Sequence, residues 1–375
     1  MKVLLCPDKF KGSLDARGVC RAIEEGVRQV YPHADVKSSP MADGGEGTCA
    51  LLTDIHHGQV VEMKVTGPLF TPVTARYGIS GDGQMAFIEM AEASGLTLLR
   101  PEERNPMLTT SFGTGELIAD AIRRKVQKII LGIGGSATND AGIGMAAALG
   151  FSFCDKSGEV LKPIGENLIH IHHIKHHQVN PELKNISITT LCDVTNPLYG
   201  PDGAAFVYGP QKGGTASHLQ LLDAGLRNFR RIVHKQLKIS VDFPGAGAAG
   251  GLGAGARVFL SASIQRGIAF MIESTSLRQQ IADADLVITG EGKIDRQTLS
   301  GKVVSEVIRL ASEVGKPVIA VCGKSELSVE DVRLLGISQL VSLVDKATSE
   351  EFAMKNTARL LTEKIASSFR ERTKE

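Results

Sequence analysis

Short apolar runs that end in Gly, Pro or Asp alternate with amphipathic stretches along most of this chain. Residues 3–6, 128–131 and 286–289 are such runs, and residues 186–190 are a further predicted strand. Residues 13–31 carry the apolar stripe of a helix that Ser13 is expected to cap, and residues 350–369 are predicted to form a closing helix. This alternation is typical of parallel strands that are connected by helices. We therefore predict an α/β fold.

The length of the chain, 375 residues, exceeds what one hydrophobic core usually supports, so two domains are expected. The parallel alternation occupies both ends of the chain. Residues 59–90 instead form consecutive short strands with Gly/Pro turns, which is typical of antiparallel or mixed sheet. We predict a Rossmann- or flavodoxin-like parallel-sheet domain from residues 1–65 and 281–375. Residues 66–280 are then an inserted second α/β domain that contains mixed sheet.

The composition favours a cytoplasmic protein that acts on small molecules. A formal net charge of +1 and sparse aromatic residues argue against nucleic-acid binding. No apolar run approaches the roughly 20 residues of a membrane helix, and residues 1–7 do not resemble a signal peptide. The six cysteines form no C-x-x-C pair, and several lie in apolar strands, as reduced thiols do.

The glycine-rich stretch 132–144 (GIGGSATNDAGIG) follows a predicted strand and precedes an apolar helical segment. Glycines at such a turn let backbone N–H groups approach an anion, and a helix N-terminus adds partial positive charge. The small polar residues within the turn are either helix caps or ligand contacts. We predict a binding turn for a phosphate or a carboxylate.

Four other turns at predicted strand ends combine glycine with charged residues: 7–13, 43–48, 192–200 and 289–295. Ligands of open α/β sheets bind outside the carboxyl ends of the strands, where these side chains project. Lysines there can contact phosphate, and carboxylates can hold Mg²⁺ or accept a proton. The alternatives are solvated loops with ordinary caps, and an Asx-turn at Asp193.

Three other patterns are weaker. Residues 245–250 match G-x-G-x-x-G, but no long apolar strand precedes them, so a dinucleotide site is not expected. The segment 322–325 (CGKS) lacks the first glycine of a P-loop. Five histidines between residues 170 and 177 match no common zinc spacing, and we interpret them as an exposed segment without a ligand.

Glycine turns, lysines and carboxylates at strand ends are the groups that phosphoryl transfer needs. From the residues alone we predict a nucleotide-dependent transferase. The alternative from another class is a non-catalytic sensor that binds a small organic acid between two lobes. A homo-oligomer is compatible with the sequence, which does not decide the oligomeric state.

In matching order from residue 2 to beyond residue 323, five of these segments resemble the motif set of bacterial type-1 glycerate kinases: 7–13, 42–48, 132–144, 192–198 and 289–295. The resemblance implies ATP- and Mg²⁺-dependent phosphorylation of D-glycerate to phosphoglycerate, with the 2-hydroxyl as the expected acceptor. It also implies two α/β domains with the active site in the cleft between them.

On this hypothesis each candidate residue has a role. Asp193 orients the glycerate hydroxyl as a base, and Lys9 and Lys293 neutralise the transferring phosphate. Metal candidates are Asp43, Glu291 and Asp295. Candidates for binding substrate or nucleotide are Lys11, Ser13, Gly44, Gly45, Gly134, Gly135, Ser136, Thr138, Asn139, Asn196, Gly251, Gly253 and Gly292.

Overall fold

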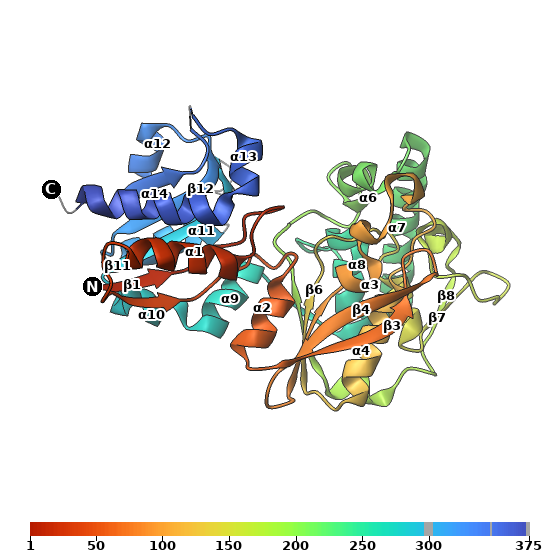
Figure 1. The fold of residues 1–375 in the computed structure, drawn as a ribbon. Helices are drawn as coiled ribbons and strands as arrows, with labels where there is room; N and C mark the ends of the chain where they lie inside the picture. Colours follow the sequence, from red (N-terminus) through yellow and green to blue (C-terminus); the bar gives the residue numbers. More distant parts are fainter. Residues whose placement is uncertain (296–302, 346, 373–375) are drawn as a thin grey trace. The chain divides into compact units, whose positions relative to one another are not determined.

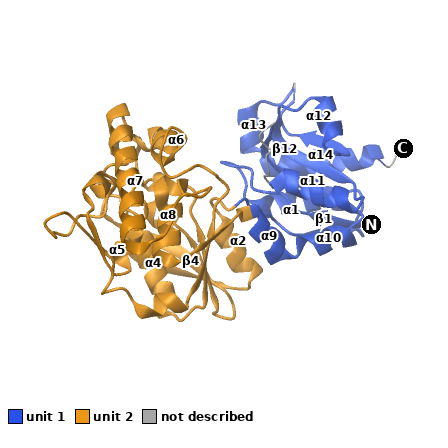
Figure 2. Cartoon of the chain, turned by 180° about the vertical axis from the view of Figure 1, so that it is seen from behind, with its two compact units in different colours: residues 1–43, 268–375 blue, residues 44–267 orange. Residues whose placement is uncertain are grey.

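The computed structural model describes residues 1–295, 303–345 and 347–372 (Figure 1). The chain forms two compact units, one of residues 1–43 and 268–375 and one of residues 44–267 (Figure 2). We call them unit 1 and unit 2 and describe each by itself. Within the described ranges, no helix combines the length and the apolarity that crossing a lipid bilayer requires.

Unit 1 is built on a five-stranded sheet in the described part of the chain. Its strands are β1 (Lys2–Leu5), β2 (Asp35–Ser38), β11 (Leu286–Ile294), β12 (Val318–Ser325) and β13 (Gln339–Ser342). The spatial order is β2-β1-β11-β12-β13, and every pair is parallel. Counted within the unit this is the order 2-1-3-4-5, which is the flavodoxin-like arrangement. The predicted parallel sheet from both chain ends is confirmed.

The strand order of unit 1 reverses between β1 and β11. In open α/β sheets the ligand binds outside the carboxyl ends of the strands at such a reversal. The segment 7–13 follows the carboxyl end of β1. Residues 289–294, predicted as a turn, instead continue β11 and pair with β12, so that turn prediction was wrong. The topology still brings these two charged segments to one place.

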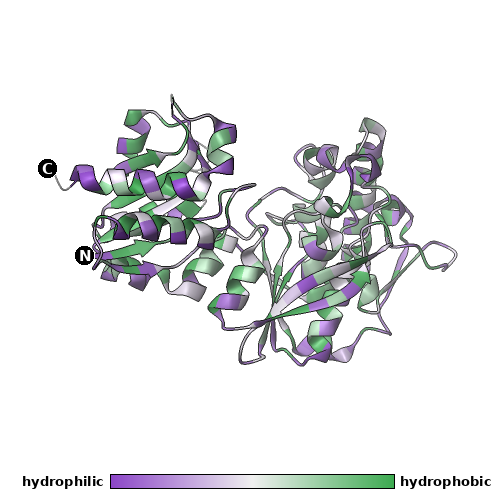
Figure 3. Cartoon of the chain, viewed as in Figure 1, coloured by the Kyte–Doolittle hydropathy of each residue, from purple (hydrophilic) through white to green (hydrophobic). Residues whose placement is uncertain are grey.

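The helices of unit 1 cover its sheet with apolar faces. They are α1 (Ala16–Arg28), α9 (Gly267–Thr275), α10 (Leu277–Asp283), α11 (Val303–Glu313), α12 (Val329–Leu334), α13 (Glu350–Lys355) and α14 (Thr357–Arg372). In α1, the buried side chains of Val19, Ile23 and Val27 recur at helical spacing and join the core with β1, β11 and β12. Figure 3 shows the strands as hydrophobic and α1 and α14 as mixed.

Two local predictions in unit 1 were wrong. The cap of α1 is Asp15, whose Oδ1 accepts the Gly18 N–H at 2.6 Å, and not Ser13. Ser13 instead donates its hydroxyl to the Met354 carbonyl at 2.9 Å. The closing helix predicted over 350–369 is two helices, α13 and α14, which meet at Asn356.

Unit 2 contains a six-stranded mixed sheet in the described part of the chain, as predicted. Its strands are β3 (Gln59–Thr66), β4 (Pro72–Ile79), β5 (Met85–Glu89), β6 (Lys128–Gly132), β9 (Ser187–Leu191) and β10 (Ser263–Gln265). The order is β10-β9-β6-β5-β4-β3. The first four of these are mutually parallel, and the β5-β4-β3 hairpins are antiparallel. A separate antiparallel pair joins β7 (Ser152–Cys154) to β8 (His173–Lys175).

Helices cover this sheet and enclose two hydrophobic clusters. They are α2 (Thr48–Ile55), α3 (Ala91–Ser94), α4 (Phe112–Arg123), α5 (Ile143–Ala148), α6 (Ala204–Tyr208), α7 (Ala216–Leu237) and α8 (Ala248–Leu260). Short 3₁₀ turns connect them: η1 (Leu96–Leu98), η2 (Pro101–Glu103), η3 (Gly165–His170), η4 (Pro181–Asn185) and η5 (Pro210–Lys212). Strand β6 is buried on both faces, which explains the continuous apolar run of its residues 129–131.

The unit boundaries fall at 43/44 and 267/268, whereas the prediction placed the domain boundaries near 65 and 280. Strand β3 pairs along its whole length with β4, from Gln59 opposite Ile79 to Thr66 opposite Pro72. This pairing places residues 59–66 in the second sheet. The predicted location of the active site between the two domains stays a prediction.

Candidate active site

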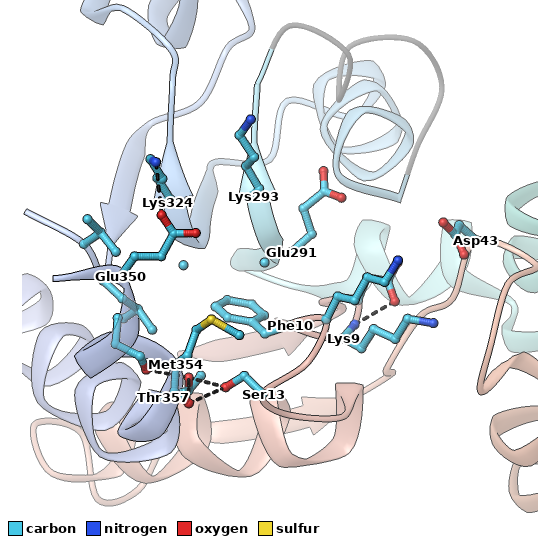
Figure 4. Close-up of a pocket in the computed structure, with 17 residues that line it drawn as sticks. Lys9, Phe10, Ser13, Asp43, Glu291, Lys293, Lys324, Glu350, Met354 and Thr357 are labelled. Carbon is cyan, nitrogen blue, oxygen red and sulfur yellow. Dashed lines mark hydrogen bonds and ion pairs between the residues drawn. The ribbon is translucent and has the colours of Figure 1, made fainter. Parts of the chain in front are cut away.

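A cavity of about 540 Å³ opens at the carboxyl ends of the unit 1 strands (Figure 4). Its volume lies within the range that small-molecule sites usually have. It brings together these predicted residues: Lys9, Lys11, Ser13, Asp43, Glu291, Gly292 and Lys293. Lys324 also lines it. We call it the lysine cavity.

Backbone pairing positions the lysines. The Asp8 N–H donates to the Gly290 carbonyl at 2.8 Å, which ties the loop after β1 to β11. Lys293 on β11 and Lys324 on β12 are register partners. Register partners on adjacent parallel strands project to the same face, so both ammonium groups reach the same space. Gly292 lies beside the Lys11 backbone, where an added Cβ would be 3.2 Å from the Lys11 nitrogen.

One side of the lysine cavity is apolar. The phenyl ring of Phe10 and the thioether of Met354 lie together there in Figure 4. Leu343, Val344 and Ala353 extend this surface. Aromatic and aliphatic walls beside a few charged groups are the usual composition of a site for a heterocyclic ligand.

Carboxylates share the cavity with the lysines. Burial, together with the charges of Asp43 and Glu291, raises the pKa of Asp8 to about 7. The Lys9 N–H donates to Asp8 Oδ1 at 2.6 Å and partly opposes this shift. Lys293 lies 2.9 Å from Glu326 and 3.4 Å from Asp295, and both raise its pKa. Lys324 pairs with Glu350 at 3.1 Å.

The donor set suits Mg²⁺. Mg²⁺ typically keeps several waters and takes one or two protein carboxylates plus substrate phosphate oxygens. The repulsion that Asp43 and Glu291 exert on Asp8 is what a divalent cation would relieve. Among the described residues, no three His, Cys, Asp or Glu side chains converge into a complete metal site. Asp295 does not line the cavity, and its carboxylate is near Lys293.

A second set of predicted residues lies at the carboxyl edge of the parallel strands of unit 2. Asp193 follows β9, is exposed, and accepts the Gly267 N–H on Oδ1 at 3.1 Å. Gly44 has φ of +90°, and a Cβ there would lie 2.8 Å from Asp193 Oδ2. Only glycine fits this close approach. A Cβ on Gly134 would lie 3.5 Å from Gly45 Cα, so the two glycine turns meet beside Asp193.

The turn 132–144 is organised around the buried carboxylate of Asp140. Its oxygens accept the backbone N–H of Ser111 at 2.8 Å, the Ser111 hydroxyl at 2.7 Å, and the N–H groups of Gly142 at 3.1 Å and Gly144 at 3.2 Å. Gly134 and Gly135 are exposed, whereas Thr138 and Asn139 are fully buried. Asp140 therefore holds the turn in shape and leaves its glycine end open to solvent.

Lys212 is 2% exposed and lies against the same turn. Its ammonium donates to Ser136 Oγ at 2.8 Å and to the Thr138 carbonyl at 2.7 Å. Burial lowers the pKa of Lys212 to about 7, and the charge of Asp140 opposes this shift. A buried lysine of this kind is uncommon, and Lys212 was not among the predicted site residues.

The lowered pKa of Lys212 predicts a stability that rises with pH. The ordinary pKa of lysine, 10.5, applies to the unfolded chain. At pH values between about 7 and 10.5, Lys212 therefore holds its proton in the unfolded chain but not in the folded chain. The free energy of unfolding therefore rises as pH increases through this window. From about pH 7 to about pH 9.5, wild type should gain about 3 kcal/mol relative to Lys212→Met, measured by urea unfolding. Parallel curves for the two proteins would contradict the burial of a titrating lysine.

Other predicted binding residues are engaged within unit 2. Asn196 donates to the Asp202 carbonyl at 2.9 Å and accepts the Tyr208 hydroxyl at 2.6 Å. The Gly251 N–H donates to the Gly247 carbonyl at 3.2 Å. Gly251 and Gly253 are buried in α8, where a Cβ would clash with neighbouring atoms. The structure gives these residues packing or loop-holding contacts, and their binding roles stay predictions. The five histidines of segment 170–177 are exposed.

Comparison with known proteins decides the family. The sequence model described as "Glycerate kinase family" matches residues 3–372. The chain belongs to the glycerate kinase family. A protein named glycerate kinase from Halalkalibacterium halodurans is 45% identical over 360 residues, covering 96% of this chain and 95% of the relative.

Two further members of the glycerate kinase family strengthen the assignment. A protein named glycerate 2-kinase from Escherichia coli is 45% identical, covering 92% of this chain and 91% of its own. The crystal structure of a putative glycerate kinase 2 from Salmonella typhimurium has a TM-score of 0.89 at 41% identity and full coverage of both chains. The alternative of a non-catalytic sensor receives no support from these relatives.

Membership of the glycerate kinase family makes ATP the expected co-substrate. Several residues that line the lysine cavity were not among the predicted site residues. Asp8 is adjacent to the predicted Lys9. Lys324 belongs to the segment 322–325, which was not predicted as a site because it lacks the first glycine of a P-loop. Phe10 and Met354 carried no signal, because only the fold brings α13 beside the loop after β1.

Proposed function

We propose that this protein transfers the γ-phosphoryl group of ATP to the 2-hydroxyl of D-glycerate, forming 2-phosphoglycerate and ADP. Membership of the glycerate kinase family and the printed names of its relatives support this reaction. The observation that carries it is the lysine cavity at the strand reversal of a flavodoxin-like sheet.

The nucleotide is proposed to bind in the lysine cavity. The cavity of about 540 Å³ offers an apolar wall at Phe10 and Met354 for the base. Lys9, Lys11 and Lys293 then face the negatively charged triphosphate. Lysine binds phosphate as a point charge, so several lysines from different elements can follow its oxygens.

Mg²⁺ is proposed to be held by Asp43 and Glu291, with Asp8 beside them and Asp295 further along the same segment. A bound Mg²⁺ would supply positive charge that offsets the negative charge of the transferring phosphoryl group. The contribution of this chain is to hold the carboxylates at the strand ends, where a cation offsets their mutual repulsion.

Asp193 is proposed as the base. The 2-hydroxyl oxygen of glycerate attacks the γ-phosphorus, the bond from that phosphorus to the bridging oxygen of ADP breaks, and the hydroxyl proton passes to the Asp193 carboxylate. The Gly267 N–H bond holds one oxygen of that carboxylate, and Gly44 leaves room beside the other. An oriented carboxylate of this kind is the usual partner of an attacking hydroxyl in phosphoryl transfer.

The proposal is tested by following ADP release. We expect ADP to form on addition of D-glycerate and ATP, and phosphorus NMR of the product to show 2-phosphoglycerate. Chelation of Mg²⁺ should lower the rate at least about tenfold, with recovery on re-addition of Mg²⁺. ADP release that is independent of glycerate would contradict the proposal. A 3-phosphoglycerate product would overturn the assignment of the hydroxyl alone.

A further inference from the structure

The pair formed by Lys212 and Ser136 is not accounted for by the packing of unit 2. Taking an ammonium out of water is costly unless its charge is used or compensated. A methionine would fill the same space without that cost. Lys212 lies at the end of η5, yet its side chain reaches the turn after β6, and Asp140 is the opposite charge that acts on it.

The direction of the hydrogen bond makes Ser136 a donor. Its Oγ accepts from the Lys212 ammonium at 2.8 Å, so its own proton is directed elsewhere. In the part of the chain that the structure describes, no acceptor takes that proton. A hydroxyl polarised by an ammonium is a stronger donor than a free one. Ser136 is thus prepared to bind an acceptor that the protein does not supply.

The same turn has further unused hydrogen-bonding capacity. Over the described ranges, neither the oxygen nor the nitrogen of the fully buried Asn139 side chain has a partner, and neither does the Thr138 hydroxyl. Buried polar groups are rarely left in this state, and a missing ligand or water is the usual explanation. Ser136 is itself buried, at 8% exposed, and the preceding Gly134 and Gly135 are exposed.

We propose that Ser136, supported by the buried ammonium of Lys212, binds the carboxylate of the hydroxy-acid substrate. Ser136 is the contact residue, and Lys212 is a positioning residue that acts through it. This inference rests on the proposed function, because it names the part of that substrate which unit 2 recognises.

The charges of the two units favour a carboxylate over a phosphate at Ser136. Several lysines already line the cavity of unit 1, as a triphosphate requires. At the carboxyl ends of the parallel strands of unit 2, Asp193 lies close to the place where Gly44 and Gly134 approach each other. Lys212 donates a hydrogen bond to Ser136 in the turn 132–144. One buried lysine and neutral donors suit a singly charged carboxylate, and an exposed aspartate disfavours a polyphosphate.

The deciding experiment measures KM for glycerate and KM for ATP separately in Ser136→Ala. We expect KM for glycerate to rise about tenfold or more, which is the range for losing a hydrogen bond to a charged group. KM for ATP should stay within about twofold. A rise in KM for ATP instead would assign the site to nucleotide phosphate, and no change in either would remove Ser136 from binding. Both results would overturn the inference.

Lys212 is tested through a double-mutant cycle with Ser136. Because Lys212 acts through the serine, Lys212→Met should raise KM for glycerate about as much as Ser136→Ala does. The double variant should have a KM for glycerate close to that of either single variant. Fully additive effects would show that Lys212 does not act through Ser136. Lys212→Arg should recover part of the loss. If Lys212→Met does not fold, Ser136→Ala alone still decides the carboxylate contact.

A matched control is Ser263→Ala. Ser263 begins β10, the edge strand beside β9, and its hydroxyl contacts Thr189 and the Ile188 carbonyl. This variant should leave both KM values unchanged. If wild type turns over no glycerate, the proposed function fails. If wild type turns over glycerate and Ser136→Ala has wild-type KM values, only the present inference fails.

Discussion

Replacing Asp193 by Asn should lower kcat for glycerate phosphorylation by at least about a hundredfold, the scale for losing a positioned acid–base group. The asparagine oxygen can still accept the Gly267 N–H that Asp193 accepts at 3.1 Å, so the loop should keep its shape. What the variant loses is a carboxylate that can take the hydroxyl proton. The measurement is steady-state ADP release with saturating ATP and glycerate.

The Asp193 prediction has a control in the same loop. Asp202 is an exposed carboxylate after the Asn196 turn, and Asp202→Asn should retain wild-type kcat. Equal Tm values for Asp193→Asn and Asp202→Asn would exclude a general loss of stability as the cause of a lower kcat. A kcat for Asp193→Asn within a few-fold of wild type would remove Asp193 from the proposed mechanism.

Replacing Lys9 by Met should lower kcat/KM for ATP by about 10²–10³, the usual scale for removing one preorganised stabilising group from a reacting centre. Lys9 follows β1 at the strand reversal and lines the lysine cavity beside Asp8. Methionine keeps the length of the side chain and removes its charge. The loss should therefore reflect electrostatics and not packing.

A lysine outside the cavity provides the comparison for Lys9. Lys355 on α13 is exposed and pairs with Glu351 at 2.7 Å, so Lys355→Met should have little effect. Nucleotide binding measured by calorimetry separates loss of affinity from loss of turnover. If Lys9→Met bound and used ATP like wild type, the assignment of the triphosphate to the lysine cavity would be wrong.

Several elements could be predicted because their signals are local. Strand β6 and the first three residues of β11 have continuous apolar sequences, and α1 has apolar residues at helical spacing. The antiparallel hairpins of β3 to β5 followed from alternating sequences with Gly/Pro turns. The cap of α1 was misplaced, since Ser13 and Asp15 are both good caps and only the backbone geometry distinguishes them.

The candidate site was predictable only in part. Glycine and charge at strand ends pointed to Lys9, Asp43, Asp193 and Glu291, because strand ends are where α/β folds bind ligands. Nothing local predicted that Lys212 is buried. Its segment, residues 209–214, contains one proline and three glycines and has the composition of a solvated loop.

By itself the amino-acid sequence determined the element types, the glycine turns and the chemical character of the residues at strand ends. Those properties depend on neighbours along the chain, which share one helix face or one strand. Only the tertiary structure decided that Lys293 faces the same cavity as Lys324 and that Ser136 meets Lys212. Such contacts depend on strand register and on the packing of segments distant in the chain, which no local pattern encodes.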